Sequence, residues 1–180
     1  MNRHQARKAI MTAASQLFYK QGYSNTGINQ IIDEAKIAKA TLYKHFQSKE
    51  DLLIAYLEET GVTTMEGLNK ASQKGKTPLD KILAIFDHLL ELVGRTDFCG
   101  CNFLNIVYEM PDGEERIRLQ IKKQKDDVRE LFCSILGSSE EKEELANEIY
   151  TLFEGALIAH KIHKEIWPLV SAKNSIRKLI

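Results

Sequence analysis

Cysteine and proline are scarce in this chain, which has three of each among 180 residues. The three cysteines are an odd set, and no signal-peptide core precedes them, so we expect reduced thiols in a cytoplasmic protein. Long apolar runs are also missing. None approaches the roughly 20 residues that span a bilayer, and we therefore expect no membrane partner.

Recognisable catalytic motifs are missing too. The chain has no glycine-rich phosphate loop, no nucleophile elbow and no zinc-binding histidine pair, so we expect no enzyme and no cofactor. Cys99 and Cys101 lie too close for an unstrained disulfide, and a structural zinc needs about four ligands of matching spacing. We therefore expect no metal site. A redox or electrophile sensor at Cys99 stays open, because a thiol in a loop can be exposed.

Net charge is zero, with 25 basic and 25 acidic residues, but the charges are unevenly placed. Residues 1–57 hold eight basic and four acidic side chains, which leaves +4 there and −4 on the remainder. A basic N-terminal part on an acidic body is typical of a phosphate-binding head, although solvated helix faces would give the same count.

Apolar spacing predicts three helices and the start of a fourth within residues 10–57. The first ends at Gly22 in a left-handed cap, Thr26 caps the second, and Ser48 with Asp51 caps the fourth. Between them a turn over 36–38 leads into a short helix over 39–46, which makes a helix-turn-helix. Outward groups on that short helix are suited to phosphates and base edges, while Leu42 and Phe46 anchor it to the core.

The remainder also reads as helices, so the expected fold class is all-α, with a DNA-binding domain over 1–47 and a helical regulatory domain over 48–180. Thr77 and Pro78 begin one helix, and Pro111 and Asp112 restart the chain into another. Ser138 is predicted to cap a long helix that reaches about Lys164, and 170–180 to form the last one.

The segment LFYKQGYSNTGINQIIDEAKIAKATLYKHFQSKEDLL resembles the DNA-binding domain of the tetracycline-repressor (TetR) family. The match rests mainly on Leu17, Phe18, Gly22, Tyr23, Thr26, Ile31, Thr41, Leu42, Tyr43, Phe46, Ser48, Lys49 and Glu50. The resemblance implies a homodimer with two DNA-reading heads and a helical ligand-binding body.

The resemblance also implies a DNA-binding set: Thr26, Lys36, Lys39, Ala40, Thr41, Tyr43, Lys44, His45 and Lys49. Thr41, Tyr43, His45 and Lys49 match positions that touch DNA in the family, and we expect Tyr43 and Lys49 to reach outward. Two departures stand in the turn. Lys36 replaces a glycine in a left-handed position, and Ala38 replaces a capping serine; each costs about 1 kcal/mol.

Aromatic and polar side chains of the body suggest a small-molecule pocket with mostly apolar walls. The candidates are Phe86, Phe98, Phe103, Asn105, Tyr108, Glu109 and Gln124. An equally good interpretation is a core filled with aromatic rings. Glu109 and Gln124 are the most informative, because a buried carboxylate or amide needs a partner.

The helix from Ser138 to Lys164 has two apolar sides, whereas a helix on a monomer's surface needs only one. We expect one side to meet a second copy of the chain, unless both sides are buried within one body. The predicted dimer interface is Ile149, Phe153, Leu157, His160 and Trp167.

These features predict a dimeric DNA-binding repressor that leaves a near-palindromic operator when a small apolar or amphipathic ligand binds the body. Two alternatives remain. One is a ligand-independent architectural DNA-binding protein on the same fold, and the other is a helical adaptor that has lost DNA binding.

Overall fold

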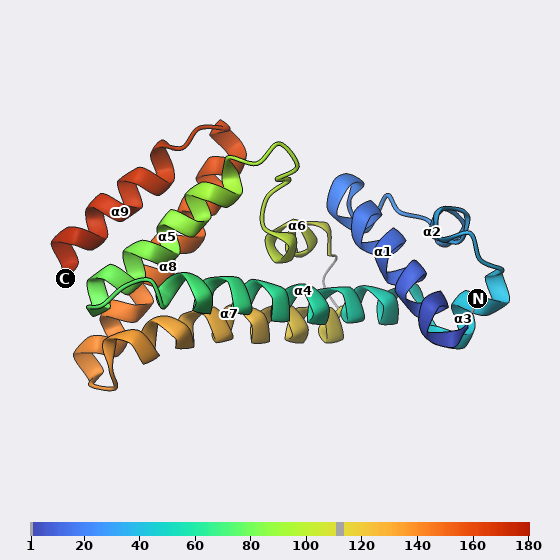
Figure 1. Ribbon diagram of the computed structural model, residues 1–180, viewed down its shortest axis with the longest axis horizontal. Helices are drawn as coiled ribbons and strands as arrows, with labels where there is room; N and C mark the ends of the chain where they lie inside the picture. Colours follow the sequence, from blue (N-terminus) through green and yellow to red (C-terminus); the bar gives the residue numbers. More distant parts are fainter. Residues whose placement is uncertain (1, 111–113) are drawn as a thin grey trace. The chain divides into compact units, whose positions relative to one another are not determined.

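The structure is a computed structural model, and it describes residues 2–110 and 114–180 (Figure 1). The all-α prediction is confirmed. The helices are α1 (Arg3–Gln21), α2 (Ile28–Ala35), α3 (Lys39–His45), α4 (Lys49–Ser72), α5 (Pro78–Val93), α6 (Asn102–Glu109), α7 (Glu115–Leu136), α8 (Glu140–His163) and α9 (Trp167–Leu179). Within the described ranges, none of them is long and apolar enough to cross a bilayer.

The chain forms two compact units. The first contains residues 1–61 and 101–122, and the second contains 62–100 and 123–180, so α4 and α7 each contribute to both. The functional boundary expected at residue 47 stays a prediction.

The first unit is built on α1, which packs against α2 and α3. Ile10, Ala14 and Phe18 of α1 are buried with Ile31 of α2, as the apolar spacing predicts. α1 ends at Gly22 as expected, although that residue has φ 90° and ψ 160°, which is not a left-handed helical cap. Such a backbone strongly favours glycine.

Three predicted helix starts are wrong. α2 is capped by Gly27, because the Thr26 hydroxyl instead donates to the Gly22 carbonyl at 2.6 Å. α8 follows Ser139, not Ser138, and has no side-chain cap. α9 begins at Trp167, so Pro168 lies in its first turn, where a missing N–H costs no hydrogen bond. The restart expected at Pro111 and Asp112 lies outside the described residues.

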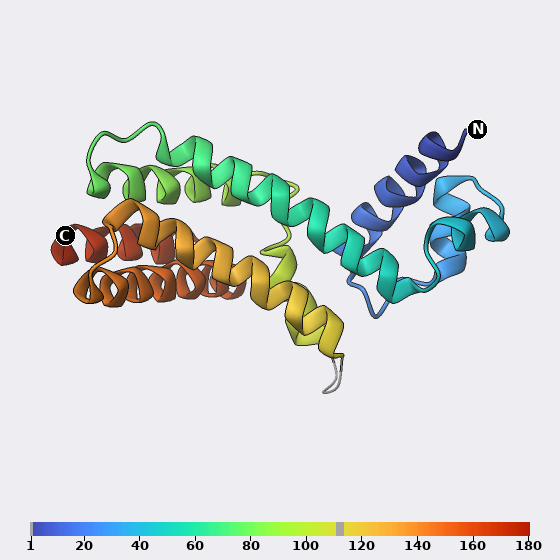
Figure 2. The ribbon, with the colours of Figure 1, turned by 90° about the horizontal axis from the view of Figure 1, so that it is seen from below.

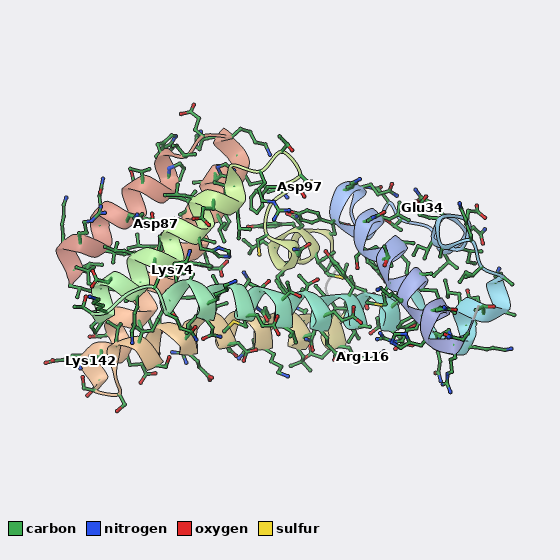
Figure 3. All side chains as sticks on the ribbon, viewed as in Figure 1. Glu34, Lys74, Asp87, Asp97, Arg116 and Lys142 are labelled. Atoms are coloured by element: carbon green, nitrogen blue, oxygen red, sulfur yellow. The ribbon has the colours of Figure 1, made fainter. Side chains whose placement is uncertain are left out.

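In the second unit α9 packs against α5 and α8 (Figure 2). The ring of Phe153 on α8 meets Phe86 and Phe132 edge-on, with centroids 5.9 and 5.7 Å away. Polar ties reinforce this core. Lys125 donates to Glu154 at 2.8 Å in a mostly buried ion pair, and Lys173 of α9 binds Asp87 of α5, which is labelled in Figure 3.

This core contains most of the residues predicted for the dimer interface. Ile149, Phe153, Leu157 and His160 are at most 7% exposed within a single chain, and Trp167 alone of the set is open to solvent. The sequence indicates two apolar sides of α8, and the structure buries within its own chain the side that we expected to meet a partner. The side that contacts α5, α7 and α9 holds the larger rings.

Candidate nucleic-acid interface

α3 has an anchored side and an open side. Leu42 and Phe46 are buried in the first unit, as predicted, and they fix a helix of seven residues that would not be stable alone. The open side carries Lys39, Ala40, Tyr43 and Lys44, and Lys36 is exposed in the preceding turn; Thr41 and His45 are half-buried at its edges. A fixed surface of cations, a hydroxyl and a small residue suits a DNA groove.

The turn before α3 has the two departures that the sequence indicates. Lys36 has φ 53° and ψ 50°, a left-handed conformation that strains a residue with a Cβ. Ala38 occupies the N-cap position without a side-chain hydrogen bond. The helix nevertheless starts at Lys39, because burial of Leu42 and Phe46 outweighs costs of about 1 kcal/mol each.

Lys49 does not reach outward, which corrects the expectation for this residue. Its ammonium donates to the Tyr23 carbonyl and lies 4.0 Å from the centre of the Tyr23 ring. Partial burial lowers the pKa of Lys49, while the negative charge of Glu109 raises it. In this arrangement Lys49 holds the α1–α2 turn. Its contact with a phosphate, and that of every other residue in the predicted set, stays a prediction.

Thr26 is also turned inward. Its side chain is 1% exposed, and the hydroxyl is occupied by Gln21 and the Gly22 carbonyl. We therefore assign the Thr26 side chain a structural role in the turn. Only the backbone of this residue is then available for a contact with a phosphate. The sequence favoured a cap for α2 at this position, because a threonine directly before an apolar helix is a preferred N-cap residue.

Arg116 connects two helices of the first unit, and the sequence analysis did not identify it. Its guanidinium donates to Asp51 at 2.8 Å and lies 3.2 Å from Glu50, so α7 is tied to the first turn of α4 (Figure 3). Hydrogen bonds from Arg116 and Ser48 lower the pKa of Asp51. The Asp51 carboxylate also accepts a hydrogen bond from the Ser48 hydroxyl at 2.9 Å, in the cap that starts α4. A contact across 65 residues leaves no local pattern in the sequence.

The predicted pocket residues are divided between the two units. Phe103, Asn105, Tyr108 and Glu109 belong to the first unit, and Phe86, Phe98 and Gln124 belong to the second. Their environments also differ. Phe86 and Phe103 are core rings, the Phe98 ring lies tilted against His160 with centroids 5.9 Å apart, and Tyr108 is 70% exposed. Glu109 accepts from the backbone amide of Ser24 at 2.7 Å.

Gln124 is the exception. Its side chain is 4% exposed, and its amide nitrogen has no hydrogen-bond partner among the described residues. An unpaired buried donor costs about 1–3 kcal/mol, so native structures rarely leave one without reason.

Comparison with known proteins gives two family matches. Residues 10–56 match the model described as bacterial regulatory proteins, tetR family, and residues 78–176 match the model described as tetracyclin repressor-like, C-terminal domain. The repressor NemR of Escherichia coli is 25% identical over 188 residues, covering 98% of this chain and 94% of its own. An HTH-type regulator from the lacX 3′ region of Lactococcus lactis is 26% identical, covering 92% and 88%.

Solved structures of TetR-family regulators have the same fold as this chain. The reduced form of E. coli NemR superposes with a TM-score of 0.87 at 25% identity, covering 97% of this chain and 96% of that one. SCO4454 of Streptomyces coelicolor, a TetR-family regulator, has a TM-score of 0.89 at 23% identity, covering 97% and 88%. At that identity the second likeness concerns the fold alone.

The inward position of Lys49 generates a stability prediction. Lys49→Ala removes a charged hydrogen bond and a cation–π contact, so we expect it to lower the free energy of unfolding by roughly 1 kcal/mol in urea denaturation. Lys39→Ala removes an exposed side chain from the same region and should change it by less than about 0.5 kcal/mol. Equal effects of the two substitutions would contradict the inward assignment.

Proposed function

The chain belongs to the TetR family of bacterial transcription regulators, and from this premise we propose that it is a dimeric repressor that binds a near-palindromic operator and leaves it when a small ligand binds the second unit. The observation that carries the DNA-binding part is the anchored α3 with its open side. NemR, similar over nearly the whole chain, is itself described as a repressor. A protein that binds the bacterial chromosome would act in the cytoplasm.

Electrostatics supports α3 as the DNA-reading element. Lys36, Lys39 and Lys44 are exposed in or beside α3, and none of them forms an ion pair with another residue in the described ranges. Cations without an internal partner can neutralise phosphates and release counterions, which gives binding its salt dependence. Tyr43, 43% exposed and one position before Lys44, can bond a phosphate or stack at a groove edge.

Replacing Lys44 tests this surface. We expect Lys44→Ala to weaken binding to a duplex that the wild-type protein selects from a random-sequence pool. The log–log salt slope should fall by about 1.8, because the substitution removes one phosphate contact from each of the two heads of the dimer. Fluorescence anisotropy over a salt series measures both. Lys142→Ala, an exposed lysine of the second unit (Figure 3), is the matched control. Identical slopes for wild type and Lys44→Ala would remove α3 from the interface.

Gln124 supports the ligand-responsive part. A buried amide with an unpaired N–H is the kind of group that orients a bound molecule. The complementary ligand would present a hydrogen-bond acceptor, such as a carbonyl or ether oxygen, within a mainly apolar body. A ligand-independent DNA-binding protein would have no use for the unpaired donor.

Gln124→Met keeps the length of the side chain and removes the unpaired N–H. In the ligand-free protein we expect it to raise the free energy of unfolding by about 1 kcal/mol, because the cost of an unsatisfied buried donor disappears. Gln120→Met, on the half-buried neighbouring turn, should be nearly neutral. Should Gln124→Met destabilise the protein in urea, the amide has a partner in solution and the ligand proposal loses its support.

The dimer is proposed on the other side of α8 from the one expected. Thr151, Gly155, Ile158 and Ile162 are spaced by four, three and four residues and share one face, with Ile162 70% exposed. A Cβ on Gly155 would meet nothing within 4 Å, so nothing described within the chain requires a glycine there. Mid-helix glycine costs about 1 kcal/mol relative to alanine, and close approach of a second backbone would explain its presence.

The α8–α9 surface extends this face. A groove of about 640 Å³ lies between the two helices and includes Thr151, Leu152 and Leu179. Near the turn between the same helices, Ile166 and Trp167 are 57% and 48% exposed. A second copy related by a two-fold axis would cover these groups in a four-helix interface. Two heads would then meet half-sites about one DNA turn, roughly 34 Å, or a multiple of it, apart.

Gly155→Arg tests the dimer without touching the core. The monomer has room for the side chain, so we expect an intact circular dichroism spectrum and thermal transition, a halved mass in light scattering, and DNA affinity reduced by at least tenfold, because one head binds alone. Val62→Arg, at another exposed position, should stay dimeric. A Gly155→Arg protein that keeps the wild-type mass would exclude α8 as the interface.

A further inference from the structure

The turn between α1 and α2 is held by a carboxylate from a distant helix. Glu109, the last residue of α6, accepts a hydrogen bond from the Ser24 amide at 2.7 Å. The same carboxylate crowds Gly22, since a Cβ built there would lie 2.5 Å from Oε1 and 2.9 Å from Oε2. Gly22 therefore meets two separate demands: a φ of 90°, and space for the Glu109 side chain.

A cation holds the same turn from α4. The Lys49 ammonium donates to the Tyr23 carbonyl, and Glu109 is close enough to raise the pKa of Lys49. The turn thus offers an N–H to the anion and a C=O to the cation, which matches the polarity of each backbone group. Lys49 and Glu109 together fix three consecutive residues that connect α1 to α2.

α6 is attached to the same unit at its other end. The Tyr56 hydroxyl of α4 donates to the Asn102 side chain, at the start of α6, and the Tyr56 ring packs edge-on against Phe18 of α1 with centroids 5.6 Å apart. Asn102 and Glu109 are seven residues apart, two helical turns. A shift or partial unwinding of α6 must therefore either break the hydrogen bond between Glu109 and Ser24 or move the α1–α2 turn together with α6.

We propose that Glu109 is a latch: its carboxylate couples the position of α6 to the α1–α2 turn, and through that turn to the DNA-reading helices α2 and α3. This inference rests on the proposed function and adds a means of regulating it. The latched arrangement is the DNA-binding one. A change that withdraws α6 removes the carboxylate from the turn, frees the connection between α1 and α2, and lowers DNA affinity because the two helices must be ordered again on binding.

The test compares Glu109→Ala, Glu109→Gln and a charge-matched control in the full-length protein. Glu115→Gln is that control, since Glu115 is exposed in the same unit. In Glu109→Ala we expect the Ser24 amide to exchange about tenfold faster, the loss of one charge-assisted hydrogen bond, and the affinity for the selected duplex to fall about three- to tenfold. Glu109→Gln should lie between, because its amide oxygen still accepts from Ser24.

A double-mutant cycle gives a readout that general destabilisation does not. Gly22→Ala is strained by its backbone in any background, but its conflict with the carboxylate disappears in Glu109→Ala. We therefore expect Gly22→Ala to lower the melting temperature less in Glu109→Ala than in the wild type. Strictly additive shifts would show that Gly22→Ala does not disturb the contact between the Glu109 carboxylate and the turn, and would overturn the latch.

The remaining outcomes separate the latch from the proposed function. Wild-type DNA affinity in Glu109→Ala, or unchanged Ser24 exchange, overturns the latch while the repressor proposal stands. A wild-type protein that selects no duplex overturns the repressor proposal, and the regulatory role of Glu109 fails with it even where Ser24 exchange responds as expected.

Discussion

The burial of two side chains of α3 is the constraint on which the candidate interface depends. Seven residues cannot maintain a helix in water, and this helix starts from a strained Lys36 and an uncapped Ala38. Leu42 and Phe46 hold it against the α1 and α4 core, so the position of the open side is set by apolar packing. One face of α3 is therefore buried and stabilises the fold, and the opposite, exposed face carries the side chains proposed to contact DNA.

Polar contacts then connect this packed core to the helices that follow. Glu109, Asn102 and Arg116, from α6 and α7, all bind residues of α1, α4 or the turn between α1 and α2. Each contact joins segments more than 40 residues apart and uses a charge or an amide that solvent could replace. Such contacts contribute modestly to the free energy of unfolding, but they fix how the helices are placed relative to one another. This suits them to switching between two arrangements of the helices.

Much of the fold could be predicted from the sequence, because helix periodicity, the cap at Thr77 and the glycine at 22 are local signals. The left-handed conformation of Lys36 and the anchoring role of Leu42 and Phe46 could also be predicted from the sequence. The long-range contacts could not be predicted from the sequence. Lys49 and Glu109 both bind the α1–α2 turn, and the ring of Phe153 packs in the core of its own chain; no local pattern indicates any of these contacts. Periodicity gives a helix two faces but does not say which neighbour covers each one.

The proposal that the open side of α3 reads DNA can be tested by amide NMR of the isotope-labelled protein titrated with a duplex that it has selected. We expect the largest shifts at Lys39, Ala40, Tyr43 and Lys44 and smaller shifts in the turn at Lys36. Little change is expected along α5, which has no proposed DNA contact. Shifts concentrated on another element, or none in α3 at saturation, would contradict it.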